Sequence, residues 1–222
     1  MKIIGKIHTD FPEKFGVPRQ SGIIKGLKGK IVFEKEYQNE QAFRGLEGFS
    51  HIWVIWQFSK AIREDWSPTV KPPRLGGNKR MGVFATRSPF RPNPIGLSCL
   101  KLDSIVKDEK DGIVLNVSGI DMMDGTPIYD IKPYLPYADS YPDAKGGFAD
   151  DVKEYELEVD IPAEILGQIP EKYKDNLIEV LKQDPRPGYA MDGKEFGITY
   201  GDINVRFVVM NGVLVVLSLS EA

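Results

Sequence analysis

The sequence has few of the side chains that build disulfides, metal sites and membrane spans. It contains a single cysteine, Cys99, which excludes a disulfide framework within the chain. Two histidines, His8 and His51, leave too few ligands for a zinc site unless carboxylates do most of the binding, so we expect no metal. The longest apolar run, residues 52–58, is interrupted by Gln57 and is far too short to cross a bilayer, so we expect no membrane span.

Several sequence signatures are also missing. The first residues carry no long apolar segment followed by a small-residue cleavage site, which argues against export and makes the cytoplasm the expected location. The Gly-x-Ser-x-Gly pattern of one large hydrolase class is absent. Neither a P-loop nor a Gly-x-Gly-x-x-Gly pattern is present, which argues against an ordinary nucleotide-binding sheet.

Acidic residues are missing from one long stretch, although the whole chain carries 32 acidic and 29 basic residues. No Asp or Glu lies between Asp65 and Asp103, where seven basic residues and six prolines are found. Proline lacks the N–H donor that helices and central strands need, so the stretch is expected to be largely a stiff, basic loop. Such a loop suits the positioning of phosphates, but composition alone fits a solvated surface loop equally well.

Sequence patterns typical of β-strands are abundant. Short runs rich in Ile, Val, Phe, Tyr and Trp alternate with Gly, Pro, Asn and Asp, which predicts a mainly β fold with a closed single-sheet barrel. Asp111-Gly112 and Asn211-Gly212 are strong hairpin signals, because glycine accepts the positive φ of tight turns. The barrel strands are predicted near residues 3–8, 30–37, 51–58, 82–86, 97–106, 113–120, 128–131 and 155–159.

The pattern changes near residue 160, so we expect a barrel domain over residues 1–160 and a small α+β domain over residues 161–222. In the second, apolar residues at fourfold spacing predict a helix over residues 162–183, broken or kinked at Pro170. Strands are predicted at residues 196–200, 204–209 and 213–219. A short helix is also expected over residues 39–46, with Asn39 as its N-cap.

Three further places could carry chemistry, each with a simpler structural interpretation. In the segment from Asp121 to Tyr134, the turn at Asp124-Gly125-Thr126-Pro127 offers an exposed backbone and a hydroxyl to a polar small molecule, but by itself it fits a plain turn between strands. The polar loop at residues 15–22 is equally ambiguous. His51 begins an aromatic strand, where a hydrogen-bonded structural role is commoner than catalysis, and Cys99 reads as a small buried hydrophobe.

The segment Phe84-Ala-Thr-Arg-Ser-Pro-Phe-Arg-Pro-Asn-Pro-Ile-Gly-Leu-Ser98 resembles the TsaA-like family, and more closely its tRNA (N6-threonylcarbamoyladenosine) N6-methyltransferases. The resemblance extends, in the same order along the chain, to residues 18–20, 44–51, 72–78, 130–137, 184–187 and 204–207. It implies a single β-barrel, a homodimer, and S-adenosylmethionine bound near the dimer interface. It also implies methylation of the modified adenosine just 3′ of the anticodon, so tRNA is the expected partner.

The resemblance also assigns the cofactor shell. It implies cofactor contacts at Pro18, Arg19, Gln20, Ser59, Lys60, Arg87, Leu97, Asp124, Gly125, Thr126 and Pro127. The division is chemically reasonable, because ribose hydroxyls suit a carboxylate such as Asp124 and the cofactor carboxylate suits an arginine. N–H groups around Gly125 and Thr126 would complete the shell.

The expected reaction is direct in-line methyl transfer to N6, helped mainly by positioning. Some group must assist loss of the N6 proton, and Asp124 and His51 are the candidates, between which the sequence does not choose. Phe90 and Arg91 are candidates for stacking on splayed anticodon-loop bases. The expected RNA contacts are Lys71, Arg74, Lys79, Arg80, Arg91, Arg186 and Arg206.

Two other functions stay open at this point. The same barrel could bind cofactor and RNA without catalysis, since the cofactor shell alone would look the same. It could also methylate another RNA or a small molecule. The C-terminal domain is expected either to contact tRNA or only to stabilise the barrel.

Overall fold

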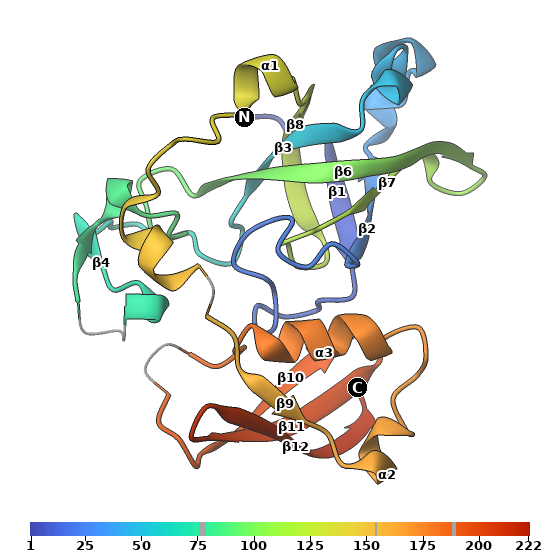
Figure 1. Cartoon of the computed structure of the whole chain (residues 1–222). Coiled ribbons are helices and arrows are strands. Elements are labelled where there is room, and N and C mark those ends of the chain that lie inside the picture. The colour runs from blue at the N-terminus through green and yellow to red at the C-terminus, as the bar shows by residue number, and fades with distance from the viewer. Residues whose placement is uncertain (76–78, 154, 188–189) are drawn as a thin grey trace.

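A closed barrel forms the larger of two β units (Figure 1). The structure is a computed structural model, and it describes residues 1–75, 79–153, 155–187 and 190–222. Antiparallel strands close in the order β1-β2-β7-β6-β3-β8, which confirms the predicted mainly β barrel. The strands are β1 (Gly5–Thr9), β2 (Lys28–Phe33), β3 (His51–Gln57), β6 (Ile95–Asp108), β7 (Gly112–Ser118) and β8 (Thr126–Pro133).

The second unit is a smaller sheet in the order β10-β11-β12-β9 with helices beside it. Its elements are β9 (Glu158–Asp160), α2 (Ala163–Leu166), α3 (Lys174–Lys182), β10 (Glu195–Tyr200), β11 (Ile203–Met210) and β12 (Val213–Glu221). β9 pairs in parallel with β12, so this sheet takes in residues that precede the expected boundary at residue 160. The predicted helix is interrupted at Pro170, which lies between α2 and α3.

The remaining elements are short. They are β4 (Thr69–Val70), β5 (Met81–Gly82), α1 (Pro136–Asp139) and the 3-10 turns η1 (Lys35–Tyr37), η2 (Glu40–Phe43), η3 (Leu46–Gly48), η4 (Pro73–Leu75), η5 (Val83–Ala85) and η6 (Gly147–Val152). Four of the expected segments differ from this outcome. The strand expected at residues 155–159 lies in the C-terminal sheet as β9, and the strand expected at residues 30–37 ends at Phe33, before η1. The strand predicted for residues 82–86 is wrong beyond Gly82, because the chain turns into η5 there. The segment 39–46 forms two 3-10 turns instead of one helix, although Asn39 caps the first, as predicted, by accepting a hydrogen bond from the Gln41 N–H at 3.0 Å.

Strand β3 shows why the sequence folds into a barrel. Its alternate side chains Ile52, Val54 and Trp56 are buried, while those between them are half-buried on the other face. Because side chains of a strand alternate between its two faces, one face of each strand can fill the barrel. Ile52 and Val54 belong to one hydrophobic core with Leu100 and Leu115 from β6 and β7.

Both hairpins predicted from Asx-Gly pairs are present. Gly112 has φ 71° at the start of β7, and the Asn211-Gly212 pair has φ 53° and 81° between β11 and β12. At Asn211-Gly212, positive φ at both central residues gives a turn whose twist matches that of the paired strands, whereas in the Asp111-Gly112 pair only the glycine has positive φ. These turns set the registers in which Asp108 faces Gly112 and Met210 faces Val213.

The two units share a continuous core. Helix α3 lies between the barrel and the C-terminal sheet (Figure 1), with Leu177, Val180 and Leu181 buried. The rings of Phe11 and Tyr200, one from each unit, lie 5.1 Å apart. Packing across this junction makes the second unit part of the same folded body.

A long connection between β3 and β6 projects away from the barrel, and we call residues 58–94 the arm (Figure 1). Its base is closed by a hydrogen bond from the Phe58 N–H to the Pro94 carbonyl at 2.8 Å. Farther out, β4 and β5 pair, with Thr69 opposite Gly82. The arm contains most of the proline-rich basic stretch that the composition singled out.

Candidate functional site

One end of the barrel gathers most of the expected cofactor residues. It is the end where β1 finishes and β8 begins, since Ile7 pairs with Thr126, and where Gln57 of β3 meets Ile95 of β6. The turn that holds Asp124 lies there, directly before β8. Ser59 and Lys60 also lie there, just past the end of β3.

A hydrogen bond joins two of the expected segments. The Arg87 guanidinium on the arm donates from Nη1 to the Gln20 side-chain oxygen, across 67 positions of sequence. The next residue, Ser21, accepts a hydrogen bond at its Oγ from the Cys99 N–H of β6 at 3.2 Å. Leu97, two residues earlier on β6, leaves 56% of its surface exposed. The loop, the arm and β6 are therefore held together at one place, which we call the cofactor junction.

Beneath this junction lies a carboxylate that the sequence did not single out. Ser98 Oγ donates to Asp121 Oδ1 at 2.6 Å and accepts from the Trp56 indole N–H at 2.9 Å. Burial raises the pKa of Asp121 to about 6, although the hydrogen bonds from Ser98 and the Ser21 backbone and the nearby charge of Arg87 oppose that rise. The segment that holds Asp121 was noted in the sequence, but only the contacts of distant residues show that this carboxylate is half-buried and partly withdrawn from water.

Asp124 has a partner that the sequence did not indicate. Its Oδ1 lies 3.1 Å from His8 Nδ1 and accepts a hydrogen bond from the Thr9 N–H at 3.1 Å. Both side chains are about half exposed, so the pair faces solvent. The only local signal was that His8 ends a predicted strand; the pairing of β1 with β8 brings it to Asp124.

The backbone donors expected around this turn are already used. The Gly125 N–H donates to the Ile7 carbonyl at 2.8 Å, and the Thr126 N–H donates to Met123 at 3.3 Å. The Thr126 hydroxyl also bonds to Met123, at 2.8 Å. The expectation of free N–H groups at Gly125 and Thr126 is therefore wrong, and the Asp124 side chain is the part of the turn that remains open to a ligand.

His51 lies at the other end of the barrel. Its neighbour Ile52 pairs with Pro133, the last residue of β8, whereas Asp124 precedes the first. The His51 ring lies 2.9 Å from Ser50 Oγ at Nδ1, and its centroid is 6.2 Å from that of Tyr134. Within one chain, the two candidates for the proton step are thus separated by the length of β8.

The arm carries most of the expected RNA contacts. Lys71, Lys79 and Arg80 are exposed, and Arg80 Nη1 donates to the Thr69 hydroxyl at 2.8 Å. The side chain of Arg74 and residues 76–78 of the resembling segment lie outside the described part of the chain. Arg91 is half-buried and holds the arm itself, because Nη1 donates to the Thr86 carbonyl at 3.0 Å.

The two arginines expected to contact RNA from the C-terminal unit both form ion pairs. Arg186 donates from Nε and Nη2 to the two carboxylate oxygens of Asp184 at 2.8 and 2.9 Å, and from Nη1 to Asp192 at 3.0 Å. Only 9% of its side chain is exposed. Arg206 pairs with Glu195 on the surface and is 64% exposed. The Arg186 guanidinium is thus committed to structure.

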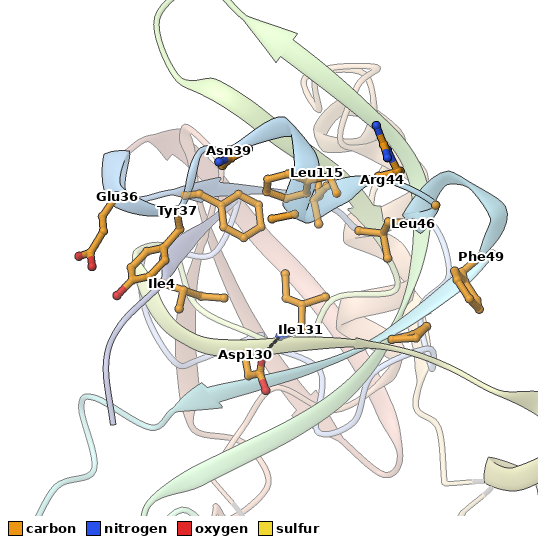
Figure 2. Close-up of a pocket in the computed structure, with 15 residues that line it drawn as sticks. Ile4, Glu36, Tyr37, Asn39, Arg44, Leu46, Phe49, Leu115, Asp130 and Ile131 are labelled. Atoms are coloured by element: carbon orange, nitrogen blue, oxygen red, sulfur yellow. Dashed lines mark hydrogen bonds between the residues drawn. The ribbon is translucent and has the colours of Figure 1, made fainter.

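A cavity of about 580 Å³ opens at the His51 end of the barrel (Figure 2). Leu115 and Ile131 lie in its wall, with Tyr37, Leu46 and Phe49 around them. None of the expected cofactor residues lines it. The cofactor site is therefore argued from the contacts at the Asp124 end, not from this cavity.

Two family models match the chain. One, described as the tRNA-methyltransferase O N-terminal domain, matches residues 6–140, and the other, described as the TrmO C-terminal domain, matches residues 154–222. The chain belongs to the TrmO family. The first match spans the barrel strands and the arm, and the second spans the C-terminal sheet.

Relatives within and around the TrmO family cover nearly the whole chain. A tRNA (adenine(37)-N6)-methyltransferase of Escherichia coli strain K12 is 45% identical over 226 residues, covering 97% of this chain and 95% of its own length. A putative S-adenosylmethionine-dependent methyltransferase of Pseudomonas aeruginosa is 39% identical, covering 92% and 90%. A crystal structure of TrmO from Pseudomonas aeruginosa superposes with a TM-score of 0.75 at 31% identity, over 98% of this chain and 97% of that one.

Two kinds of feature are absent from the described part of this TrmO family member. Over the residues with described positions, no helix has both the length and the apolar character needed to cross a membrane. In the same part of the chain, no group of three or more His, Cys, Asp and Glu side chains is placed to hold a metal ion.

Proposed function

We propose that the chain transfers a methyl group from S-adenosylmethionine to N6 of threonylcarbamoyladenosine at position 37 of tRNA, the adenine position that the Escherichia coli relative's name gives. The observation that carries the proposal is the junction where Arg87 bonds to Gln20, at the same end of the barrel as the exposed Asp124 carboxylate. Family membership supplies the class of reaction, and this junction supplies the side chains that the cofactor needs.

The residues at the junction fit the cofactor chemically. S-adenosylmethionine supplies an electrophilic methyl group on a sulfonium sulfur. Arg87 forms no ion pair with a described residue, so its guanidinium is open to the cofactor carboxylate. Asp124 offers carboxylate oxygens to ribose hydroxyls, and the exposed side chain of Leu97 offers an apolar surface to the adenine.

The remaining members of the proposed shell support the junction. Pro18 is buried, and Arg19 Nη2 donates to the Asp184 carbonyl at 3.4 Å, which ties this loop to the C-terminal unit. Ser59 is half-buried and Lys60 exposed at the base of the arm. Gly125, Thr126 and Pro127 act by shaping the turn that presents Asp124.

For the proton step, the geometry favours Asp124 over His51. N6 forms its bond to the methyl carbon, the electron pair of the broken C–S bond stays on sulfur, and the N6 proton must leave to a base. Asp124 and His8 lie together at the cofactor end and can take up that proton, whereas His51 lies at the far end of β8. Holding the reacting atoms in line supplies most of the remaining effect, on the order of 7–11 kcal/mol.

This assignment predicts which of three variants lose methyl-transfer activity. Asp124→Asn and His8→Gln should each lower kcat, roughly 100-fold for loss of an effective general base, and should change the pH profile of kcat. His51→Gln tests the alternative. A loss of kcat confined to His51→Gln, with normal rates in the other two variants, would transfer the proton step to His51. Stopped assays of methyl transfer at several pH values measure all three.

The arm is proposed to hold the RNA backbone. Lys71, Arg74, Lys79 and Arg80 would contact phosphates, which makes tRNA affinity salt-dependent. Arg206 stays a candidate because its side chain is mostly exposed. For Arg186, the buried ion pair supports the other expectation, that the C-terminal unit stabilises the barrel.

The decisive experiment is incubation with methyl-labelled S-adenosylmethionine and tRNA that carries threonylcarbamoyladenosine. Label in that nucleoside supports the proposal, and its absence leaves the non-catalytic RNA-binding barrel. Unmodified tRNA, other RNAs and small-molecule acceptors assayed in parallel decide whether the substrate is a different one.

We also propose a homodimer with the cofactor near its interface, and a cytoplasmic location. Sedimentation analysis with and without S-adenosylmethionine tests the first. A monomer under both conditions would contradict it. Cell fractionation tests the second.

A further inference from the structure

Two aromatic contacts join the outgoing limb of the arm, which includes β4, to its returning limb, which includes β5. The Trp66 and Phe84 rings lie 6.1 Å apart at 34° to each other, and the Arg63 guanidinium lies 3.9 Å from the centre of the Phe90 ring. Both contacts continue the pairing of β4 with β5, which extends to a hydrogen bond from the Val83 N–H to Pro68 at 2.9 Å. The arm thus presents its rings in a defined arrangement.

These rings are unusually exposed for large apolar groups. Trp66 is 52% exposed, Phe84 74% and Phe90 40%, and Ile62, also on the arm, is 59% exposed. Aromatic side chains normally contribute most by being buried. A group of four such side chains on a projecting two-stranded segment indicates a surface that is covered when a partner binds.

The charge around the rings points to a polyanion. The arm carries eight basic residues and two acidic ones, Glu64 and Asp65. Among the residues whose positions are described, no basic side chain of the arm forms an ion pair. Exposed rings set among uncompensated cations are the combination that binds unpaired nucleic acid, because bases stack on the rings while the cations meet the phosphates.

We propose that Trp66 and Phe84 form a stacking platform for an unpaired base of the RNA substrate. The proposal rests on the tRNA methyltransferase function proposed above and assigns a contact surface to it. Phe84 lies three residues before Arg87, and the turn between them is held by hydrogen bonds from the Thr86 N–H and hydroxyl to Val83 at 3.1 and 2.8 Å. A base stacked here lies on the same limb that bonds to Gln20, so its neighbour is directed toward the cofactor residues.

A second copy of the chain fits this surface less well. In a twofold interface the same patch meets itself, so the cations of one arm would face those of the other. Like charges brought together in this way oppose association, whereas RNA phosphates neutralise them. Dimerisation through this patch is nevertheless an outcome that the experiment detects.

The test compares Trp66→Ala and Phe84→Ala with Tyr137→Ala in the full-length protein. Tyr137 is 88% exposed on α1, at the His51 end of the barrel, so it is a matched loss of an exposed ring. The probe is an anticodon stem-loop RNA that carries threonylcarbamoyladenosine, with affinity measured by fluorescence anisotropy. We expect each arm variant to bind about 10-fold more weakly, the effect of losing one stacked base, and Tyr137→Ala to bind as wild type.

Two further measurements separate the platform from a folding effect. Trp66→Phe keeps a stacking ring, so it should restore most of the affinity that Trp66→Ala loses. The Kd for S-adenosylmethionine, measured by calorimetry, should be the same in all variants. Unchanged RNA affinity in Trp66→Ala and Phe84→Ala, or failure of Trp66→Phe to restore it, would overturn the platform.

Sedimentation of the same variants decides the remaining case. Loss of a dimer in the arm variants, with RNA affinity falling only as a consequence, would make the patch a self-interface and overturn the proposal. The proposed platform and the proposed methyltransferase function can be refuted independently. Wild-type protein that methylates tRNA while both arm variants keep its KM refutes the platform alone, and RNA binding that depends on the rings without methyl transfer refutes the function alone.

Discussion

At the scale of single residues, the half-buried Asp121 is the group whose behaviour is least expected from the sequence. It lies where the loop at Ser21, the strand at Ser98 and the arm at Arg87 come together. An ionised carboxylate in a buried place is costly unless hydrogen bonds and a counter-charge offset the loss of water. The hydrogen bonds here are present, but they compensate only in part, since the pKa remains raised.

The raised pKa predicts a pH-dependent stability. With a pKa of about 6 in the folded protein and an ordinary value of 3.8, Asp121 binds more protons when folded, so its contribution is present at low pH and lost as the pH rises through about 6. Urea unfolding should therefore show that Asp121→Asn removes a decrease in unfolding free energy of about 1 kcal/mol between pH 5 and pH 7.

Asp103 is the control for that measurement. Burial favours its protonated form, but hydrogen bonds from Lys28, Lys101 and Ser118 hold its pKa below the ordinary value. Its contribution is present above that value and lost in acid, so Asp103→Asn should reduce stability at pH 7. Equal pH dependence in wild type and Asp121→Asn would show that Asp121 titrates normally.

At the scale of elements, the contact between β3 and β6 depends on a missing side chain. Gly96 pairs with Trp56, and a methyl group at Gly96 would run into the Trp56 ring. The same ring donates the hydrogen bond to Ser98 that leads to Asp121. The glycine thus allows the ring to lie flat over β6 beneath the cofactor junction.

Gly96→Ala should therefore destabilise the barrel by about 1–3 kcal/mol, the usual cost of overpacking. It should also weaken cofactor binding, because the displaced indole disturbs Ser98. Gly82→Ala is the control, since a methyl group added there would meet no described atom within 4 Å and the φ of −57° suits alanine. Denaturation midpoints and cofactor titrations of the two variants give the comparison; similar losses in both would contradict the packing argument.

At the scale of the whole molecule, the shared core predicts that the two units unfold together. The three tryptophans, at positions 53, 56 and 66, all lie in the barrel or the arm, so their fluorescence does not report on the C-terminal sheet directly. Arg186→Ala breaks the buried ion pair between Arg186 and Asp184, both in the C-terminal unit, and should lower the free energy of unfolding by about 3–5 kcal/mol. If the units are one cooperative body, the fluorescence midpoint should fall with the circular-dichroism midpoint.

Arg206→Ala removes an exposed ion pair from the same unit and should cost less than about 1 kcal/mol. It therefore controls for loss of an arginine as such. A circular-dichroism midpoint that falls in Arg186→Ala while the fluorescence midpoint stays in place would show two independent units.

Local rules account for much of the fold. Alternation in residues 51–58 predicted β3 to within one residue, and two Asx-Gly pairs predicted both hairpins, because side-chain direction and turn φ are properties of neighbouring residues. The same rules failed at residues 82–86. There the pairing of β4 with β5 ends at Gly82 and the chain turns into η5, and this cross-strand pairing leaves no periodic signal in the sequence.

The features of the candidate site also fall into those visible in the sequence and those set by tertiary structure. The acid-free stretch and the segments that resemble a known family were visible in the sequence, because they are composition and order along the chain. Barrel closure alone decided that Asp124 meets His8 and that His51 lies a strand's length away. Tertiary packing likewise withdrew Asp121 partly from water, paired Arg186 with Asp184 and left Trp66 and Phe84 exposed, since burial and pairing depend on the folded arrangement of the whole chain.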